Sequence, residues 1–408
     1  METTVSPAID MPGEGRHDRR PVPRSQVLEK PAGGALGVGN APEAARASDT
    51  ASTWALLLAG AAITIGLIWD MSWDMSFGRD SFWSPPHLAV NVGGAFAAGA
   101  AVWWAARATR RRDPAAVGFG RVRMPLGAAV VLWGSAAMLA SGALEIAWSR
   151  AYGMTIGAWT PPQVLFVIAV SAVLAGILFV AASRGEGGPR LAVPCAAGLA
   201  LTFAGVALAP YSLPNLQHGT LFFLLASAAF PLLLAWTARG AATRWAATLA
   251  ALIYTATVCL MVWVLPLVPA RALIGPVFEK VDHMVPPRFP LLLVVPALLF
   301  DRVVVGKPRS RGGEWPRAAV LGVAFAAAFI LVQWSFAAFL LQPASDDWFF
   351  AGGGRHWPFY VDIGEERRQF WDAQGGLTAG SALACALVAT LAARVGLALG
   401  RFTQELER

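Results

Sequence analysis

Carboxylate and imidazole groups gather near the ends of the apolar segments of this chain, where they could bind a metal ion. Imidazole nitrogen favours copper, zinc or iron, and the nearby thioethers of Met71 and Met75 tilt the choice towards copper. The histidines show no local metal-binding spacing such as HxxxH, so the ligands must come from several segments. We predict a transition-metal site, with copper as the candidate ion, assembled from Asp70, Asp74, His87, Glu145, His218 and His283.

Two arginines and a further aspartate follow these carboxylates closely. An ionised side chain at the edge of an apolar layer is costly unless it is paired. We therefore expect Arg79 to neutralise Asp70, and Arg150 to neutralise Glu145. Asp80 is expected to belong to the same group of charge partners. The alternative interpretation is that the carboxylates only reach interfacial water at the ends of helices.

The same motif occurs twice. Residues 70–87 read D-x-x-W-x4-G-x4-W-S-P-P-H, and residues 145–163 read E-x-x-W-x4-G-x5-W-T-P-P-Q. Ser84 and Thr160 are expected to cap the following helices, with the prolines in the first helical turn. The glycines allow a tight bend, and the tryptophans suit a membrane interface. A looser version, D-H-M-V-P-P-R at 282–288, is expected to open another helix.

Apolar segments long enough to cross a bilayer recur along the chain and position these groups. Residues of the AVILMFWYC set make up 56% of the sequence and charged residues 14%, against roughly 25% charged residues in soluble domains. The composition predicts an all-α, polytopic transmembrane helical bundle of about ten spans. The expected spans are 53–70, 87–106, 125–145, 162–182, 190–209, 217–237, 245–266, 288–305, 317–341 and 376–399.

Charge in the connecting loops predicts how the chain is oriented. Basic residues concentrate after the even-numbered spans, as in RATRRRDP and GKPRSRGGEWPR, so these loops and both termini are predicted to be cytoplasmic. The motif at 70–87 and the loop at 342–375, a candidate lid, are then extracytoplasmic. We expect a multi-pass protein of a bacterial inner membrane. The net charge of +7 reflects this topology, and we expect the lipid bilayer as a partner and no nucleic acid.

The first 52 residues differ in composition from the rest. They are rich in Pro, Gly, Ala and charge, and they lack apolar periodicity, which predicts a disordered cytoplasmic tail before the transmembrane domain at 53–408. Cys195, Cys259 and Cys385 lie singly in apolar runs and are interpreted as core residues. The sequence contains no Walker loop, GxSxG elbow or HExxH motif.

The first motif resembles part of the A subunit of the membrane-bound copper monooxygenases, the particulate methane and ammonia monooxygenase family. The similar elements are Trp69-Asp70, Trp73-Asp74, Arg79-Asp80, Trp83 with Pro85-Pro86, Glu145-x-x-Trp148 and His356-Trp357-Pro358. The resemblance covers about a third of the chain and implies copper-dependent oxidation of a small apolar substrate that enters from the bilayer. This chain departs from the family in having ten expected spans instead of about seven. The order Arg-Asp is also reversed, and the resemblance does not make Asp70 or His87 a copper ligand.

Three other functions fit the same sequence. A structural or assembly subunit of a membrane complex, or a homo-oligomer, needs no site at all. A transporter would use the repeated two-span unit, although no span carries a charge near its middle. A lipid-linked transferase would use acidic groups of the first outer loop, Asp74 and Asp80.

Overall fold

The computed structural model describes residues 43–78, 83–112, 116–153, 159–183, 189–271, 282–304, 313–345, 347–351 and 372–405. The chain divides into two units, Met1–Arg46 and Ala47–Arg408, and the bundle belongs to the second. Most of the predicted tail lies outside the described residues. The first helix begins at Glu43, before the predicted start of the first span at residue 53.

Each of the ten predicted spans contains a helix, and the expected all-α membrane bundle is confirmed. The helices are α1 (Glu43–Phe77), α2 (Pro85–Arg111), α3 (Leu126–Tyr152), α4 (Pro161–Ala182), α5 (Ala192–Ala207), α6 (Thr220–Gly240), α7 (Ala246–Val264), α8 (Val294–Val304), α9 (Glu314–Leu340) and α11 (Ala379–Glu405). Within the described chain, eight helical segments are long and apolar enough to cross a membrane. The loop before α3 forms a short antiparallel hairpin of β1 (Val117–Phe119) and β2 (Val122–Met124).

Two helices, α5 and α8, are shorter than predicted. The 16 residues of α5 extend about 24 Å and the 11 residues of α8 about 17 Å, against about 30 Å of hydrocarbon. Irregular chain with two 3₁₀ turns, η2 (Ala209–Tyr211) and η3 (Leu216–His218), follows α5. Extended chain at 282–293 precedes α8. The prediction of ten full-length spans is therefore wrong for these two.

Small residues let neighbouring helices approach closely. A methyl group on Gly134 of α3 would lie 2.7 Å from the backbone nitrogen of Val173 in α4, so only glycine fits there. Close contacts of the same kind join α1 to α2 at Gly93 and α6 to α11 at Gly396. Helices in lipid associate through this kind of packing because apolar burial alone does not distinguish lipid from protein.

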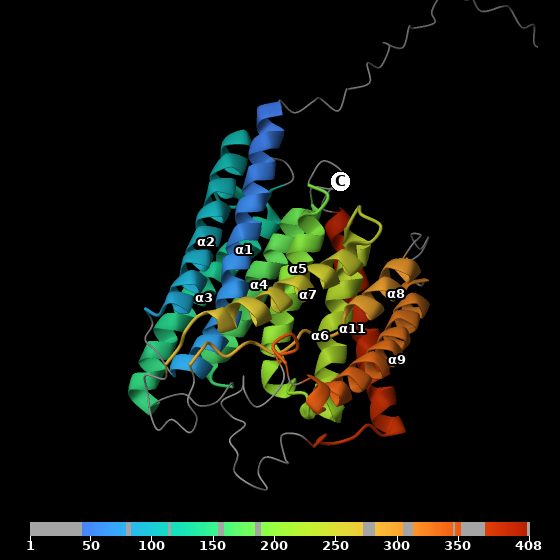
Figure 1. Ribbon diagram of the computed structural model, residues 1–408. Helices are drawn as coiled ribbons and strands as arrows, with labels where there is room; N and C mark the ends of the chain where they lie inside the picture. The colour runs from blue at the N-terminus through green and yellow to red at the C-terminus, as the bar shows by residue number, and fades with distance from the viewer. Residues whose placement is uncertain are drawn as a thin grey trace, which may run out of the picture. The chain divides into compact units, whose positions relative to one another are not determined.

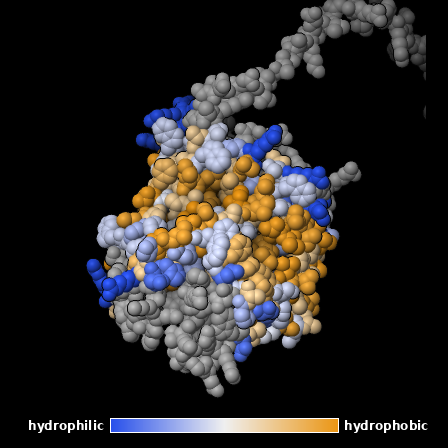
Figure 2. Space-filling view, viewed as in Figure 1, coloured by the Kyte–Doolittle hydropathy of each residue, from blue (hydrophilic) through white to orange (hydrophobic). Residues whose placement is uncertain are grey.

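Ends and surface of the bundle agree with a membrane-embedded body. In the unit Ala47–Arg408, the start of α1 and the end of α11 lie at the same edge of the bundle (Figure 1), as an even number of crossings requires. Hydrophobic side chains cover the middle of the face in Figure 2, and hydrophilic ones lie towards its margins. The cytoplasmic location of these ends stays a prediction.

Two buried acids fasten helix ends at the edge that the charge pattern predicts to be cytoplasmic. The carboxylate of Asp301 in α8 accepts hydrogen bonds from the amides of Ala247 (3.1 Å) and Thr248 (2.8 Å), and so caps α7. Glu314 at the start of α9 pairs with Arg394 at 3.2 Å and Arg401 at 2.7 Å in α11. The buried acids therefore join α8 to α7 and α9 to α11 at one edge of the bundle. The candidate acid–histidine residues of α1 and α2 lie at the opposite end.

Candidate functional site

The turn between α1 and α2 carries the acid–histidine pair. Helix α1 continues seven residues beyond Asp70, to Phe77, and ends at Gly78, whose φ of 87° is open to glycine. Helix α2 begins at Pro85, which places His87 in its first turn. Asp70 therefore lies about two turns inside its helix, not at the helix end that the sequence predicts.

Asp70 and His87 lie close together across the two helices. His87 Nε2 is 3.1 Å from Asp70 Oδ1, with side chains 37% and 20% exposed. Asp70 Oδ1 is buried and makes no hydrogen bond to any described residue. Its contact with His87 is therefore close enough for an ion pair but is not aligned as a hydrogen bond. The carboxylate oxygen thus keeps capacity for a further electrophile, a proton or a metal ion.

The end of α3 and the start of α4 resemble those of α1 and α2. Glu145 also lies seven residues before its helix ends at Tyr152, and Gly153 follows with a φ of 82°. Its carboxylate has a different partner, however, because Ser149 of the same helix donates a hydrogen bond to it at 3.3 Å. Arg150, the predicted charge partner, is exposed in the last turn of α3. The sequence repeat is thus a structural repeat with different chemistry.

The predicted helix caps are correct in position but not in their hydrogen bonds. Ser84 and Thr160 occupy the N-cap positions of α2 and α4 in extended conformations, with prolines following them. Neither side chain makes a capping hydrogen bond. Because proline occupies both of the first two helical positions, one of the two amides that an N-cap side chain normally contacts is missing.

His218 and His283 lie in other surroundings. His218 lies two residues before α6, is 3% exposed, and stands edge-on to Trp334 with ring centroids 4.7 Å apart. Burial lowers the pKa of His218, and this outweighs its backbone hydrogen bonds. His283 contacts the neighbouring carboxylate of Asp282, and its backbone bridges to Pro269.

The six predicted ligands do not form one cluster in the part of the chain that the structure describes. No three His, Cys, Asp or Glu side chains among the described residues are close enough to share an ion. Asp70 and His87 meet, and Asp74 lies one turn further along α1, while Glu145, His218 and His283 are held by other contacts. Arg79 and Asp80 lie outside the described residues, as do His356 and most of the predicted lid.

The third version of the motif has a different structure. Residues 282–293 are extended, and α8 begins only at Val294, not near residue 288 as predicted. Pro290 disfavours helical backbone at Phe289, which opposes a helix start at Pro286 and Pro287 like those at the earlier proline pairs. The segment is mostly buried, and protein groups must satisfy its backbone.

Serines of α1 and side chains of two other helices hold this segment. Ser72 donates to the carbonyl of Val285, and the Val285 amide donates to Ser76 Oγ at 2.8 Å. Further along, the amide of Leu291 donates to the Tyr254 hydroxyl at 2.8 Å, and the amide of Leu292 donates to Gln333 at 2.9 Å. The extended chain is therefore fixed against the same end of α1 that carries Asp70.

Comparison with known proteins adds no assignment to this geometry. No protein-family model, curated protein or solved structure matches the chain.

Proposed function

We propose that this integral membrane protein carries an acid–histidine site on its extracytoplasmic side, centred on Asp70 and His87, that binds a transition-metal ion. One observation carries the proposal, namely the buried Asp70 Oδ1 that makes no described hydrogen bond and lies 3.1 Å from His87 Nε2. Carboxylate oxygen and imidazole nitrogen are both common ligands of such ions.

The residues fit an exchangeable ion better than a structural one. Structural sites use about four protein ligands and catalytic sites about three, whereas the described residues supply two from separate helices. Asp74, one turn beyond Asp70, is the nearest further carboxylate of the predicted set. A site with few protein ligands keeps positions open for water or substrate.

Copper is the ion we propose, because imidazole suits it and the resemblance to the copper monooxygenases favours it over zinc and iron. Bound copper would supply redox chemistry, the activity that the resemblance to the copper monooxygenases implies. In this chain, Asp70 would act as ligand or would orient the His87 ring, since a carboxylate beside an imidazole fixes its tautomer and raises its basicity. The extracytoplasmic location follows from the charge of the loops.

Metal analysis of the purified protein tests the proposal. We expect copper, offered in competition with zinc and iron, to bind at one site per chain, and the variant His87→Gln to weaken binding at least tenfold. The matched control is His283→Gln, which alters a histidine beside another aspartate and should leave the affinity unchanged. Equal copper binding by the wild type and His87→Gln, with both variants folded, would remove the metal from this site.

A further inference from the structure

A cavity lies beside the extended segment 282–293. Its volume is about 80 Å³, and it is bounded by α1, α5, α7 and the extended chain. Most of its lining is apolar, including Met71, Met75, Val206, Val258, Phe289 and Leu291. None of the functions considered above for the acid–histidine pair uses this space.

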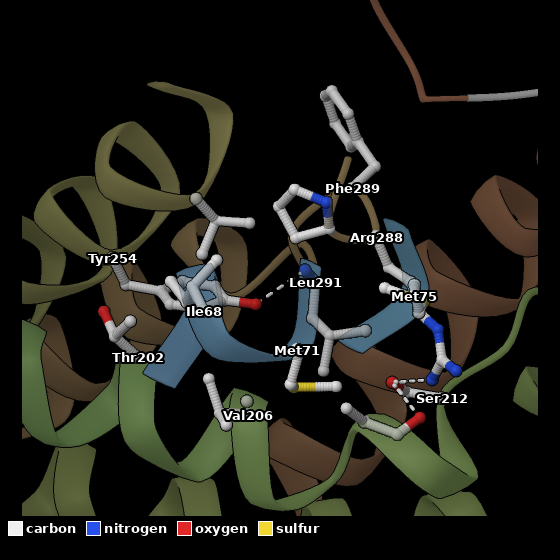
Figure 3. A pocket seen from close by; sticks show the side chains of 14 residues that line it. Ile68, Met71, Met75, Thr202, Val206, Ser212, Tyr254, Arg288, Phe289 and Leu291 are labelled. Carbon is white, nitrogen blue, oxygen red and sulfur yellow. Dashed lines mark hydrogen bonds between the residues drawn. The ribbon is translucent and has the colours of Figure 1, made fainter. Parts of the chain in front are cut away.

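The few polar groups lie at the two ends of the cavity. Figure 3 shows Arg288 and Ser212 together with Met75 at one end, and Tyr254 with Thr202 at the other. Its lining contains one positively charged side chain, Arg288, and no Asp or Glu among the described residues. The cavity is therefore positive at one end and apolar along its length.

The charged end faces the predicted extracytoplasmic side. Met75 is two residues from the end of α1, whereas Ile68 at the other end of the cavity is nine residues from it. These two residues are about 10 Å apart along the helix axis, at 1.5 Å per residue. Tyr254 lies within the span formed by α7, well away from either end. A molecule filling the cavity would point its charge outwards and its apolar part towards the middle of the membrane.

Arg288 brings a guanidinium group with five N–H donors to the charged end of the cavity. Its guanidinium donates to Ser212 Oγ at 3.3 Å, a long contact (Figure 3). A guanidinium group offers parallel donors that match the oxygens of a carboxylate or phosphate. Ser212 Oγ beside it can donate a further hydrogen bond to such a head group, in place of its 3.4 Å contact with the carbonyl of Ala209.

The extended chain that carries Arg288 is built into the fold. Its amides are bound by Ser76, Tyr254 and Gln333, from three different helices. Non-helical chain at membrane depth is tolerated where protein satisfies it, and membrane proteins use interrupted helices to form binding sites. Here the interruption opens the cavity and places an arginine at its mouth.

We propose that this cavity binds a small amphipathic anion, with its carboxylate or phosphate head on Arg288 and Ser212 and its alkyl part along Met71 and Val206 towards Tyr254. The charged end and the apolar walls of the cavity require both parts of the ligand. A free inorganic anion would contact Arg288 but would not fill the apolar part of the cavity. A neutral alkyl chain would fill the apolar part but would offer no anionic group to Arg288. A carrier or a transferase for lipid-derived substrates would each need such a site.

Binding of radiolabelled hexanoate to the full-length protein in phosphatidylcholine nanodiscs tests the proposal, with empty nanodiscs as the blank. We expect saturable binding that Arg288→Gln weakens at least tenfold and that Val206→Phe, which fills the cavity, abolishes. Two matched controls should bind normally. Arg302→Gln removes an exposed arginine of α8, and Leu260→Phe enlarges an exposed side chain of α7.

Competitors identify which parts of the ligand matter. Hexyl phosphate should displace hexanoate, whereas hexanol and inorganic phosphate should not. Displacement by hexanol as effective as by hexyl phosphate would overturn the anionic head, and displacement by inorganic phosphate would overturn the apolar part. Should Arg288→Gln fail to fold, Arg288→Lys is expected to weaken binding, because it keeps the charge but loses the parallel donors, and the result for Val206→Phe is decisive. Undiminished binding by folded Val206→Phe would refute the location.

Discussion

The two copies of the motif, which comprise the ends of α1 and α3 and the starts of α2 and α4, have similar helix ends but different contacts. Each helix ends at a glycine of positive φ, 87° at Gly78 and 82° at Gly153. An aromatic pair one turn apart stabilises each end, with ring centroids 4.3 Å apart at Trp73–Phe77 and 4.5 Å apart at Trp148–Tyr152. The shared residues are therefore the ones that build the turn.

The residues that differ between the turns are the ones able to do chemistry. Asp74 and His87 of the first turn correspond to Ser149 and Gln163 of the second. Asp70 meets the histidine of the next helix, whereas Glu145 is hydrogen-bonded within its own helix. Comparison of the repeats thus separates architecture from candidate function within one chain, without reference to any relative.

The two turns also differ in their surroundings. Extended chain packs on the last turns of α1 through Ser72 and Ser76, which are buried. The last turns of α3 are largely exposed, including Ile146 and Tyr152. The first turn is therefore embedded in the bundle, and the second is peripheral.

The largest expected effect tests this difference in surroundings. Ser76→Ala should lower the free energy of unfolding by about 1–3 kcal/mol, because the buried amide of Val285 loses its acceptor. The matched variant in the second turn, Ser149→Ala, should change stability by less than about 0.5 kcal/mol, since its surroundings are partly exposed. Equilibrium unfolding of both variants in detergent measures the two values. Equal losses would show that the two turns are embedded alike.

The membrane class of the fold follows from the sequence, because a bilayer demands long apolar segments. The sequence also contains a signal for the non-helical segment at 282–293. Pro290, three residues after a proline pair, disfavours a helix at the position where the repeat motif suggests one. The likeness of D-H-M-V-P-P-R to the true repeats hid this signal.

Pairing across helices could not be predicted in the same way. Gln333 lies in an apolar run, and such a polar residue indicates a partner inside the bundle. Its partner Gln217, at 2.6 Å, is 116 residues away in a short irregular segment. Likewise, the sequence favours Asp70 and His87 equally with four other ligands, and only the geometry brings these two together.

An intermediate effect tests what the turns share. Gly78→Ala and Gly153→Ala should each cost about 1–2 kcal/mol, because both introduce a Cβ at a positive φ, where residues other than glycine are strained. We expect the two losses to agree within about 0.5 kcal/mol. Gly99→Ala is the control, since this glycine lies inside α2 with open space around it, and the change should stabilise the protein slightly. Unequal losses of stability would mean that the two glycines do not play the same part at the two helix ends.

The smallest effect concerns the acid–histidine pair itself. His87→Gln gives the first turn the residue of the second, and it should change stability by at most about 1 kcal/mol, because a partly exposed ion pair contributes little. Combined with Asp70→Asn in a double-mutant cycle, the coupling energy should be equally small. A coupling above about 2 kcal/mol would assign the pair to the architecture. A small coupling leaves the pair free for ligand binding, since the common turn forms with glutamine at the same position in its second copy.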